Sequence, residues 1–252
     1  MGTAITVDVA DAPDGVVPGD VTVPIFAWFT AVDERFSTYK ADSEVSRLNR
    51  GEVRASDLSA DMRHVLDVCE SLRAETAGYF DAYATGRFDP SGYVKGWSVQ
   101  VASDRLIAAG LPNHCVNAGG DIRVRGRASG GGPWRIGIRH PVEHMKVAWV
   151  VAGDDIAVAT SGTYERGLHV IDPFRGAPAD ELSSVTVVGP DLGAADGYAT
   201  AALAMGRRGL DWLATLPGHT CAVVTSDGEA YTSPGLPVLP ADAPGADEPP
   251  IY

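Results

Sequence analysis

After a short strand-like start, the apolar residues of this chain are spaced like helices up to about position 110 and like strands over much of the remainder. Ile25, Phe29, Val32 and Phe36 recur every three or four residues, which places them on one face of a helix. Residues 184–188 are instead a short run typical of a strand. Helices that precede strands, followed by two late helices, predict an α+β fold.

The same patterns predict the individual elements. Helices are expected at 25–36, 62–72, 91–109, 194–205 and 210–216, and strands at 4–9, 114–117, 122–125, 134–138, 147–152, 156–159, 168–171, 184–188, 221–225 and 229–231. We assign residues 1–235 to a single domain. Residues 236–252 are rich in Pro, Ala and Asp. We predict that they form a disordered tail, because they cannot bury enough apolar surface to offset their ordering entropy.

Net charge and hydropathy exclude several classes of protein. The formal net charge of −13 argues against a nucleic-acid partner, which requires a basic face. It also makes a phosphate-bearing ligand unfavourable unless a metal ion or a few cations offset the charge. No run of about 18 apolar residues occurs, so we expect no membrane span. No signal-peptide pattern is found at the N-terminus, and we expect a cytoplasmic protein.

Two polar segments could bind a metal ion or a phosphate. Asp196 and Thr200 are four residues apart on a predicted helix, so their oxygen atoms share one face and suit Mg²⁺. The alternative is a helix N-terminus that Asp196 caps or whose dipole it complements. Lys95 lies near the start of another predicted helix, where free N–H groups favour phosphate. The alternative there is a solvated lysine.

Three further segments carry weaker signals. The sequence Asn117-Ala118-Gly119-Gly120-Asp121 permits a tight turn whose N–H groups approach an anion, or an ordinary β-turn without a ligand. His169 precedes a turn and could carry a proton, although a strand histidine is often structural. Tyr39 lies in a polar segment, where it could stack on a flat ring or simply belong to a surface loop.

Taken together and in this order, these segments resemble the FAD:protein FMN transferase family, also called ApbE. The matching pieces are Met1-Gly2-Thr3 and residues 36–49, 78–82, 89–97, 117–121, 159–173, 184–188 and 195–206. The resemblance implies a two-lobed α+β fold with FAD between the lobes. It also implies an enzyme that binds Mg²⁺ or Mn²⁺, cleaves the FAD pyrophosphate, joins FMN to a Thr or Ser of a flavoprotein, and releases AMP.

The resemblance further implies roles for individual residues. Asp196, Thr200, the Ala199 carbonyl and the backbone at Gly92 match metal-binding positions. His169 matches a catalytic histidine that takes the proton from the incoming hydroxyl or holds that hydroxyl in line. The positions that match the FAD site are Met1, Tyr39, Tyr79, Phe80, Asp81, Asp89, Lys95 and Ser184, and the turn residues Asn117, Gly119, Gly120 and Asp121 would support the flavin nucleotide.

The sequence also departs from the family pattern. Gly197 and Tyr198 stand where Ala and Leu are more usual, and the segment between Asp81 and Asp89 is short. The chain starts at its Met-Gly-Thr motif without a lipobox, which favours an intracellular target. Two other functions remain open on these grounds: an FAD pyrophosphatase that releases FMN and AMP to water, and a flavin-binding protein without catalysis.

Overall fold

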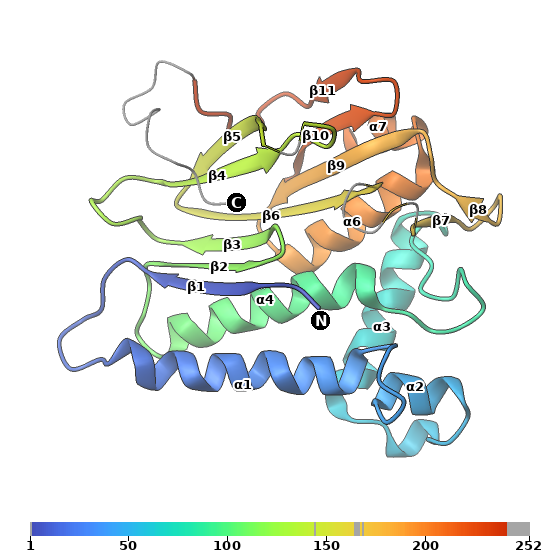
Figure 1. Cartoon of the computed structure of the whole chain (residues 1–252), viewed down its shortest axis with the longest axis horizontal. Helices are drawn as coiled ribbons and strands as arrows, with labels where there is room; N and C mark the ends of the chain where they lie inside the picture. The colour runs from blue at the N-terminus through green and yellow to red at the C-terminus, as the bar shows by residue number, and fades with distance from the viewer. Residues whose placement is uncertain (1, 144, 164–166, 168, 241–252) are drawn as a thin grey trace.

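A computed structural model describes residues 2–143, 145–163, 167 and 169–240. Its main element is a seven-stranded antiparallel sheet in the strand order β1-β2-β3-β6-β9-β10-β11 (Figure 1). The strands are β1 (Ile5–Val9), β2 (His114–Ala118), β3 (Asp121–Arg125), β6 (Asp155–Gly162), β9 (Leu182–Gly189), β10 (Thr220–Thr225) and β11 (Ala230–Thr232). Two small sheets pair β4 (Trp134–Arg139) with β5 (Val147–Gly153), and β7 (Ile171–Asp172) with β8 (Ala177–Pro178).

The helices form a layer on one face of this sheet. They are α1 (Pro18–Phe36), α2 (Glu44–Asn49), α3 (Ala60–Glu75), α4 (Ser91–Ala108), α6 (Leu192–Met205) and α7 (Arg208–Leu213), with a 3₁₀ turn at Ala55–Asp57. Helices α4 and α6 contact the sheet directly and pack against each other, while α1 and α3 contact them from outside (Figure 1). Side chains of Ser43, Ser59 and Asp191 cap the N-termini of α2, α3 and α6 by accepting a backbone N–H.

Both faces of the central strands of the large sheet are buried, and alternation along these strands divides two cores. On β6, Ala157 and Ala159 belong to the core beneath the helices, whereas Val158 belongs to the core under β4 and β5. On β3, Ile122 and Val124 join the second core. The remaining β3 side chains therefore point at the helices, and they include a buried carboxylate and a buried guanidinium.

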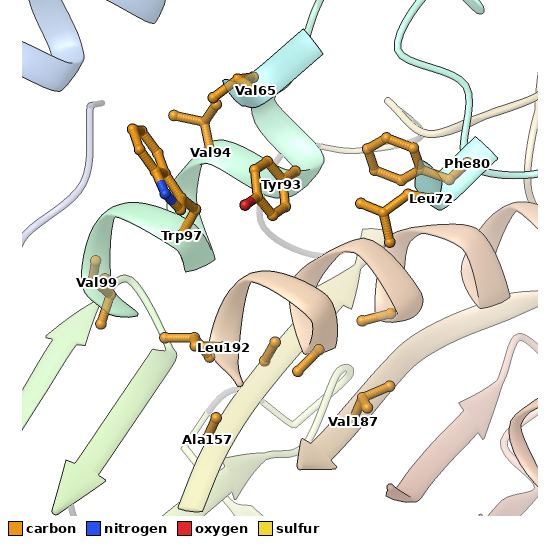
Figure 2. Packing of buried hydrophobic residues seen from close by; sticks show 14 of the residues in the cluster. Val65, Leu72, Phe80, Tyr93, Val94, Trp97, Val99, Ala157, Val187 and Leu192 are labelled. Atoms are coloured by element: carbon orange, nitrogen blue, oxygen red, sulfur yellow. The ribbon is translucent and has the colours of Figure 1, made fainter. Parts of the chain in front are cut away.

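Aromatic rings fill the helical core. Trp97 of α4 contacts Trp28 and Phe36 of α1 edge-on, with ring centroids 5.3 and 5.8 Å apart. Figure 2 shows Val65 of α3 beside Val94 of α4 in the same cluster. These contacts hold α4 between the outer helices and the sheet, so its position is fixed on both sides.

The structure confirms the predicted α+β fold and most of its elements. Helix α1 starts at Pro18, ahead of the predicted position 25, because proline is favoured at the first helical turn. The predicted strand 168–171 is wrong: β7 begins only at Ile171, and His169 lies outside any strand. The pairing strand β8 had no sequence signal, since two residues are too few to show a period.

The predicted disordered tail also needs correction at its start. Leu239 donates its backbone N–H to Val150 of β5, and Ala152 of β5 donates to Pro237. Residues 237–239 therefore continue the small β4–β5 sheet, and residues 241–252 of the predicted tail lie outside the described residues. No helix within the described ranges is long and apolar enough to cross a membrane.

Candidate active site

Two glycines of α4 let α6 approach closely. A Cβ atom on Gly92 would lie 2.9 Å from Thr200 Oγ1, and one on Gly96 would lie 2.7 Å from Asp196 Cβ. The backbone N–H of Gly96 donates to Asp196 Oδ2 at 2.9 Å. Gly92 pairs with Thr200 and Gly96 with Asp196, one turn apart on each helix, and the two helices run in opposite directions. The two residues predicted to bind metal therefore face α4.

Asp196 does not cap its helix, so a capping role does not explain this carboxylate. Asp191 is the N-cap of α6, and its Oδ1 accepts the backbone N–H of Ala194 at 2.8 Å. Asp196 lies in the second turn and is only 2% exposed. A buried carboxylate needs a compensating charge or hydrogen bonds, because its desolvation is costly.

Asp196 shares its surroundings with a second buried carboxylate. Asp121 of β3 is fully buried, and its Oδ2 lies 2.5 Å from Lys95 Nζ of α4. Its Oδ1 accepts the backbone N–H of Thr160 at 3.3 Å. Burial raises the pKa of Asp196, as does the nearby Asp121 carboxylate, while Lys95 and the Gly96 N–H partly oppose that rise. Two carboxylates therefore surround one ammonium group.

The donor atoms at this point suit a hard divalent cation. Besides the two carboxylates, Thr200 offers a hydroxyl that lies 3.2 Å from Ser161 Oγ, and Gly92 brings its backbone against Thr200. Mg²⁺ favours oxygen ligands of this type and is commonly held by only one or two carboxylates. Among the described residues no cluster of three or more His, Cys, Asp or Glu side chains could hold a metal. Hydroxyl and backbone oxygens would therefore have to complete the site.

The predicted residues from five chain segments meet around one cleft. Its cavity of 140 Å³ lies where the start of α4, the end of β6 and the segment before β7 converge. Its lining includes Tyr79, Phe80, Asp81, Asp89, Gly92, Lys95, Gly119, His169, Asp196 and Thr200. The structure thus brings the predicted metal pair, the predicted catalytic histidine and half of the predicted FAD contacts to the same place.

Two further hollows adjoin this cleft. One, of 520 Å³, is lined by Tyr39 and apolar side chains of α1 and α4, and shares Asp89 and Lys95 with the cleft. Tyr39 is 93% exposed at its edge. The other, of 330 Å³, includes Asn117, Gly119 and Gly120 and shares Gly119 with the cleft. An elongated ligand could therefore extend from the cleft in either direction.

The glycine turn between β2 and β3 has a conformation that requires its glycines. Gly119 and Gly120 have φ values of +59° and +92°, which L side chains rarely adopt. A Cβ atom on Gly119 would overlap the side chain of Thr3. Asn117 Oδ1 accepts the Gly120 N–H at 2.9 Å and closes the turn. The turn itself lines the hollow, but Asp121 at its end points to Lys95 beneath α4.

Other predicted carboxylates shape the loops that border the cleft. Asp89 Oδ1 accepts the Ser91 N–H at 3.0 Å at the entry to α4, and Asp81 Oδ1 accepts the Tyr83 N–H at 2.8 Å. The Tyr79 ring lies 4.8 Å from that of Phe174. Phe80 is nearly fully buried, which limits its contact with any ligand.

The exposed His169 side chain lies at the rim of the cleft. Its Nδ1 is 3.0 Å from the carbonyl oxygen of Gly167, so Nδ1 carries the proton that this bond requires. In the neutral ring Nε2 then holds the lone pair. This tautomer leaves Nε2 able to accept a proton.

Three further predicted residues are not among those that line the cleft. Ser184 is buried within β9 and is not among the residues that line the cleft or its two adjoining hollows. The Ala199 side chain is fully buried in α6. Met1 lies outside the described residues.

Sequence reasoning missed several lining residues. Thr3, Thr160 and Ser161 line the cleft, and Ser161 contacts Thr200. Thr160 and Ser161 lie in the same motif as His169, and Thr3 follows directly after Met1 and Gly2. Their position beside predicted site residues was the only indication in the sequence. Whether their side chains point into the cleft depends on how the strands pair, which the sequence does not show.

Comparisons with known proteins identify the family of this chain. The model of the ApbE family matches residues 1–86 and 82–224. A FAD:protein FMN transferase of Vibrio cholerae is 40% identical over 129 residues, which cover 47% of this chain and 39% of that protein. One of Rhodobacter capsulatus is 28% identical over 238 residues, which cover 91% of this chain and 43% of that protein. The chain therefore spans less than half the length of these two relatives.

Solved structures extend the comparison to the fold. The flavin transferase ApbE from Vibrio cholerae is 27% identical, with a TM-score of 0.83 over 95% of this chain and 96% of that one. The apo form of the flavinyl transferase ApbE from Pseudomonas stutzeri is 25% identical, with a TM-score of 0.80 over 93% of this chain and 92% of that one. The family match extends over most of the sequence and the structural match over nearly all of it, so the chain belongs to the ApbE family.

Proposed function

We propose that this chain is a FAD:protein FMN transferase that cleaves FAD at its pyrophosphate and attaches FMN to a Thr or Ser hydroxyl of an acceptor flavoprotein. The observation that carries the proposal is the single cleft shared by Lys95, Asp196, Thr200 and His169. In this cleft, Lys95 and a metal ion held by the oxygens of Asp196 and Thr200 would bind a pyrophosphate. His169 would act as the base for an acceptor hydroxyl. Family membership supports the same activity.

Asp196, Thr200 and the backbone at Gly92 would hold a divalent metal, with Asp121 and Lys95 adjoining it. The proposed carbonyl of Ala199 would complete this set. When bound, such a metal supplies charge neutralisation at the pyrophosphate oxygens. Mg²⁺ and Mn²⁺ both accept this kind of oxygen site. Lys95, which lines the same cleft, would add positive charge that favours the developing negative charge on the leaving phosphate.

The protein residues can also account for the transfer step. The acceptor hydroxyl oxygen attacks the phosphorus of the FMN half, the bond from that phosphorus to the bridging oxygen breaks, and AMP leaves with that oxygen. Nε2 of His169 takes the hydroxyl proton, since its other nitrogen is engaged with Gly167. Transfer of this type depends mostly on alignment and charge stabilisation.

The hollow next to Tyr39 suits a flat ring system of the substrate. Val32, Phe36 and Val94 give it an apolar lining, and the exposed Tyr39 ring at its edge can stack on a ring bound there. Tyr79, Asp81 and Asp89 would contact the same substrate across the cleft. The Asn117–Gly120 turn would support it from the opposite side.

The proposal can be tested by mass spectrometry of an acceptor. Purified protein, FAD and Mg²⁺ are incubated with a threonine-containing flavoprotein domain, and the expected result is an acceptor heavier by one FMN phosphoester. The matched control is Asp196→Asn, which keeps the side-chain shape and should abolish the adduct.

The same incubation without acceptor separates the other two functions. Rapid release of FMN and AMP would identify an FAD pyrophosphatase. Bound FAD that stays intact with Mg²⁺ and with several acceptors present would identify a flavin-binding protein without catalysis. Either result would contradict the transferase proposal.

A further inference from the structure

A third contact continues the regular pairing between α4 and α6. On α4, Gly92, Gly96 and Gln100 follow one another at intervals of four residues, which places them on one face of the helix. Their partners on α6 are Thr200, Asp196 and Leu192, again at intervals of four but in reverse order. The first two pairs border the proposed metal site. The third lies one turn beyond it.

Gln100 makes this third contact with its side-chain amide. Its Oε1 accepts the backbone N–H of Leu192 at 3.1 Å and the Nε–H of Arg123 at 3.1 Å. Its Nε2 donates to Asp104 Oδ1, also at 3.1 Å. Both lone pairs of the carbonyl oxygen are therefore used, and the orientation of the amide is fixed by its neighbours.

The Leu192 N–H is a group that the helix cannot satisfy itself. Leu192 is the first residue of α6, and the N–H groups of a first helical turn have no partner within the helix. The N-cap residue Asp191 serves Ala194 instead. Leu192 is fully buried, so water is a poor substitute. Gln100 is the acceptor that the structure provides for this N–H.

Arg123 connects the same oxygen to the sheet. Its side chain is 1% exposed, and its guanidinium donates to Asp155 Oδ1 at 2.5 Å and to the Val124 carbonyl at 2.7 Å. Arg123 is thereby held on β3 while it donates to Gln100. One amide oxygen thus links β3, α4 and the start of α6.

We propose that Gln100 is a positioning residue that fixes the rotation and height of α6 against α4, and through them the placement of Asp196 and Thr200 for a divalent cation. The inference rests on the metal site of the proposed function. It follows from helix geometry: a rotation of α6 about its axis moves Leu192, Asp196 and Thr200 together, because they lie on one face. A contact at Leu192 therefore constrains the other two.

Two substitutions of Gln100 separate its acceptor oxygen from its bulk. Gln100→Met keeps the length of the side chain and removes the acceptor. Gln100→Glu keeps an oxygen at the same place for Leu192 and Arg123, and it is combined with Asp104→Asn so that an amide and not a second carboxylate faces its other oxygen. The matched control is Ser103→Ala on the same helix, which removes a buried hydrogen bond to His114 on β2 and leaves α6 untouched.

The decisive measurement is the affinity of the metal-free protein for Mn²⁺, followed by electron paramagnetic resonance without FAD. Gln100→Met should weaken Mn²⁺ binding about 10- to 100-fold, as expected when a group that orients metal ligands is lost. The Gln100→Glu/Asp104→Asn variant should stay close to wild type, and so should Ser103→Ala. Hydrogen exchange in the first turn of α6 should accelerate in Gln100→Met and not in Ser103→Ala.

The outcomes distinguish this inference from the proposed function. If wild type binds Mn²⁺ and Gln100→Met binds it equally well, the positioning role is refuted and the transferase proposal stands. If Ser103→Ala weakens binding as much as Gln100→Met, the effect is general destabilisation and the role is also refuted. A wild-type protein without affinity for Mn²⁺ would refute both the proposed metal site and this role of Gln100.

Discussion

The backbone N–H of Gly96 in α4 donates to the carboxylate of Asp196 in α6 at 2.9 Å, although 100 positions of sequence separate the two residues. This bond forms only because Gly96 has no side chain. A Cβ atom there would lie 2.4 Å from the Leu192 carbonyl oxygen, well inside contact distance. The close approach of the two helices and the placement of the predicted metal ligand therefore have one cause.

Gly96→Ala should therefore disrupt both the packing and the site. The added methyl group must push α6 away from α4, and we expect a loss of about 1–3 kcal/mol in the free energy of unfolding. Mn²⁺ binding should weaken in parallel, because Asp196 moves with α6. Urea denaturation and a Mn²⁺ titration measure the two effects.

The control for this substitution is Gly19→Ala in α1. Gly19 has no neighbouring atom within 4 Å of an added Cβ and lies in a helix. Alanine there should keep or slightly raise stability, by about 0.5–1 kcal/mol at most. Equal losses of unfolding free energy in both variants would show that close packing at Gly96 is not the cause of the destabilisation.

Thr200 should contribute to metal binding through its hydroxyl and not through its shape. Thr200→Val keeps the volume and removes Oγ1, and we expect Mn²⁺ to bind about tenfold more weakly or worse, equivalent to about 1.4 kcal/mol. Thr200→Ser keeps the oxygen and should retain most of the affinity. Isothermal titration compares the three proteins. A valine variant with wild-type affinity would remove Thr200 from the ligand set.

Lys95 and Asp121 should behave as a coupled pair. Lys95→Met leaves the fully buried Asp121 carboxylate without its ion-pair partner, and we expect a loss of about 3–5 kcal/mol in stability. Adding Asp121→Asn should restore part of that loss while FMN transfer stays absent. A double-mutant cycle measures the coupling, for which we expect about 0.5–3 kcal/mol. Strictly additive effects would contradict the pairing.

His169 should act on transfer and not on FAD binding. His169→Ala removes the proposed proton acceptor at the rim of the cleft, so transfer should slow about 100- to 10,000-fold. FAD affinity, measured by fluorescence quenching, should change little. The control is His140→Ala, a half-buried histidine after β4 that does not line the cleft. Unchanged transfer by His169→Ala would exclude His169 as the base.

The buried His114 should make stability depend on pH. Burial lowers its pKa below the ordinary value of 6.5, while its ring bonds Ser103 and the Leu111 carbonyl. As pH falls through about 6.5, the unfolded chain gains a proton that the folded protein does not take up. The free energy of unfolding should therefore decrease toward acidic pH, by up to about 1.4 kcal/mol per pH unit from this group.

Denaturation curves between about pH 7.5 and 5.5, one unit on either side of the ordinary histidine pKa, test this assignment. His114→Gln should be less stable at neutral pH and should lack this slope, whereas His140→Ala, at a half-buried histidine, should retain it. A slope that persists in His114→Gln would mean that another group is responsible.

Local spacing alone determined a large part of the fold and of the site. The intervals among Ile25, Phe29, Val32 and Phe36 predicted α1, since helical geometry sets which residues share a face. The same rule put Asp196 and Thr200 on one side of α6. These features depend on residues within one or two turns, so a single segment of sequence contains the information.

Only the tertiary structure decided what these faces meet. The sequence did not pair Lys95 with Asp121, did not place Gly96 against Asp196, and did not bring Gln100 to Leu192. Each contact joins distant segments, and its existence depends on how every helix and strand between them packs. Periodicity could place Asp196 on a helix face, but only the packing of α4 and α6 against the buried sheet made that face part of a site.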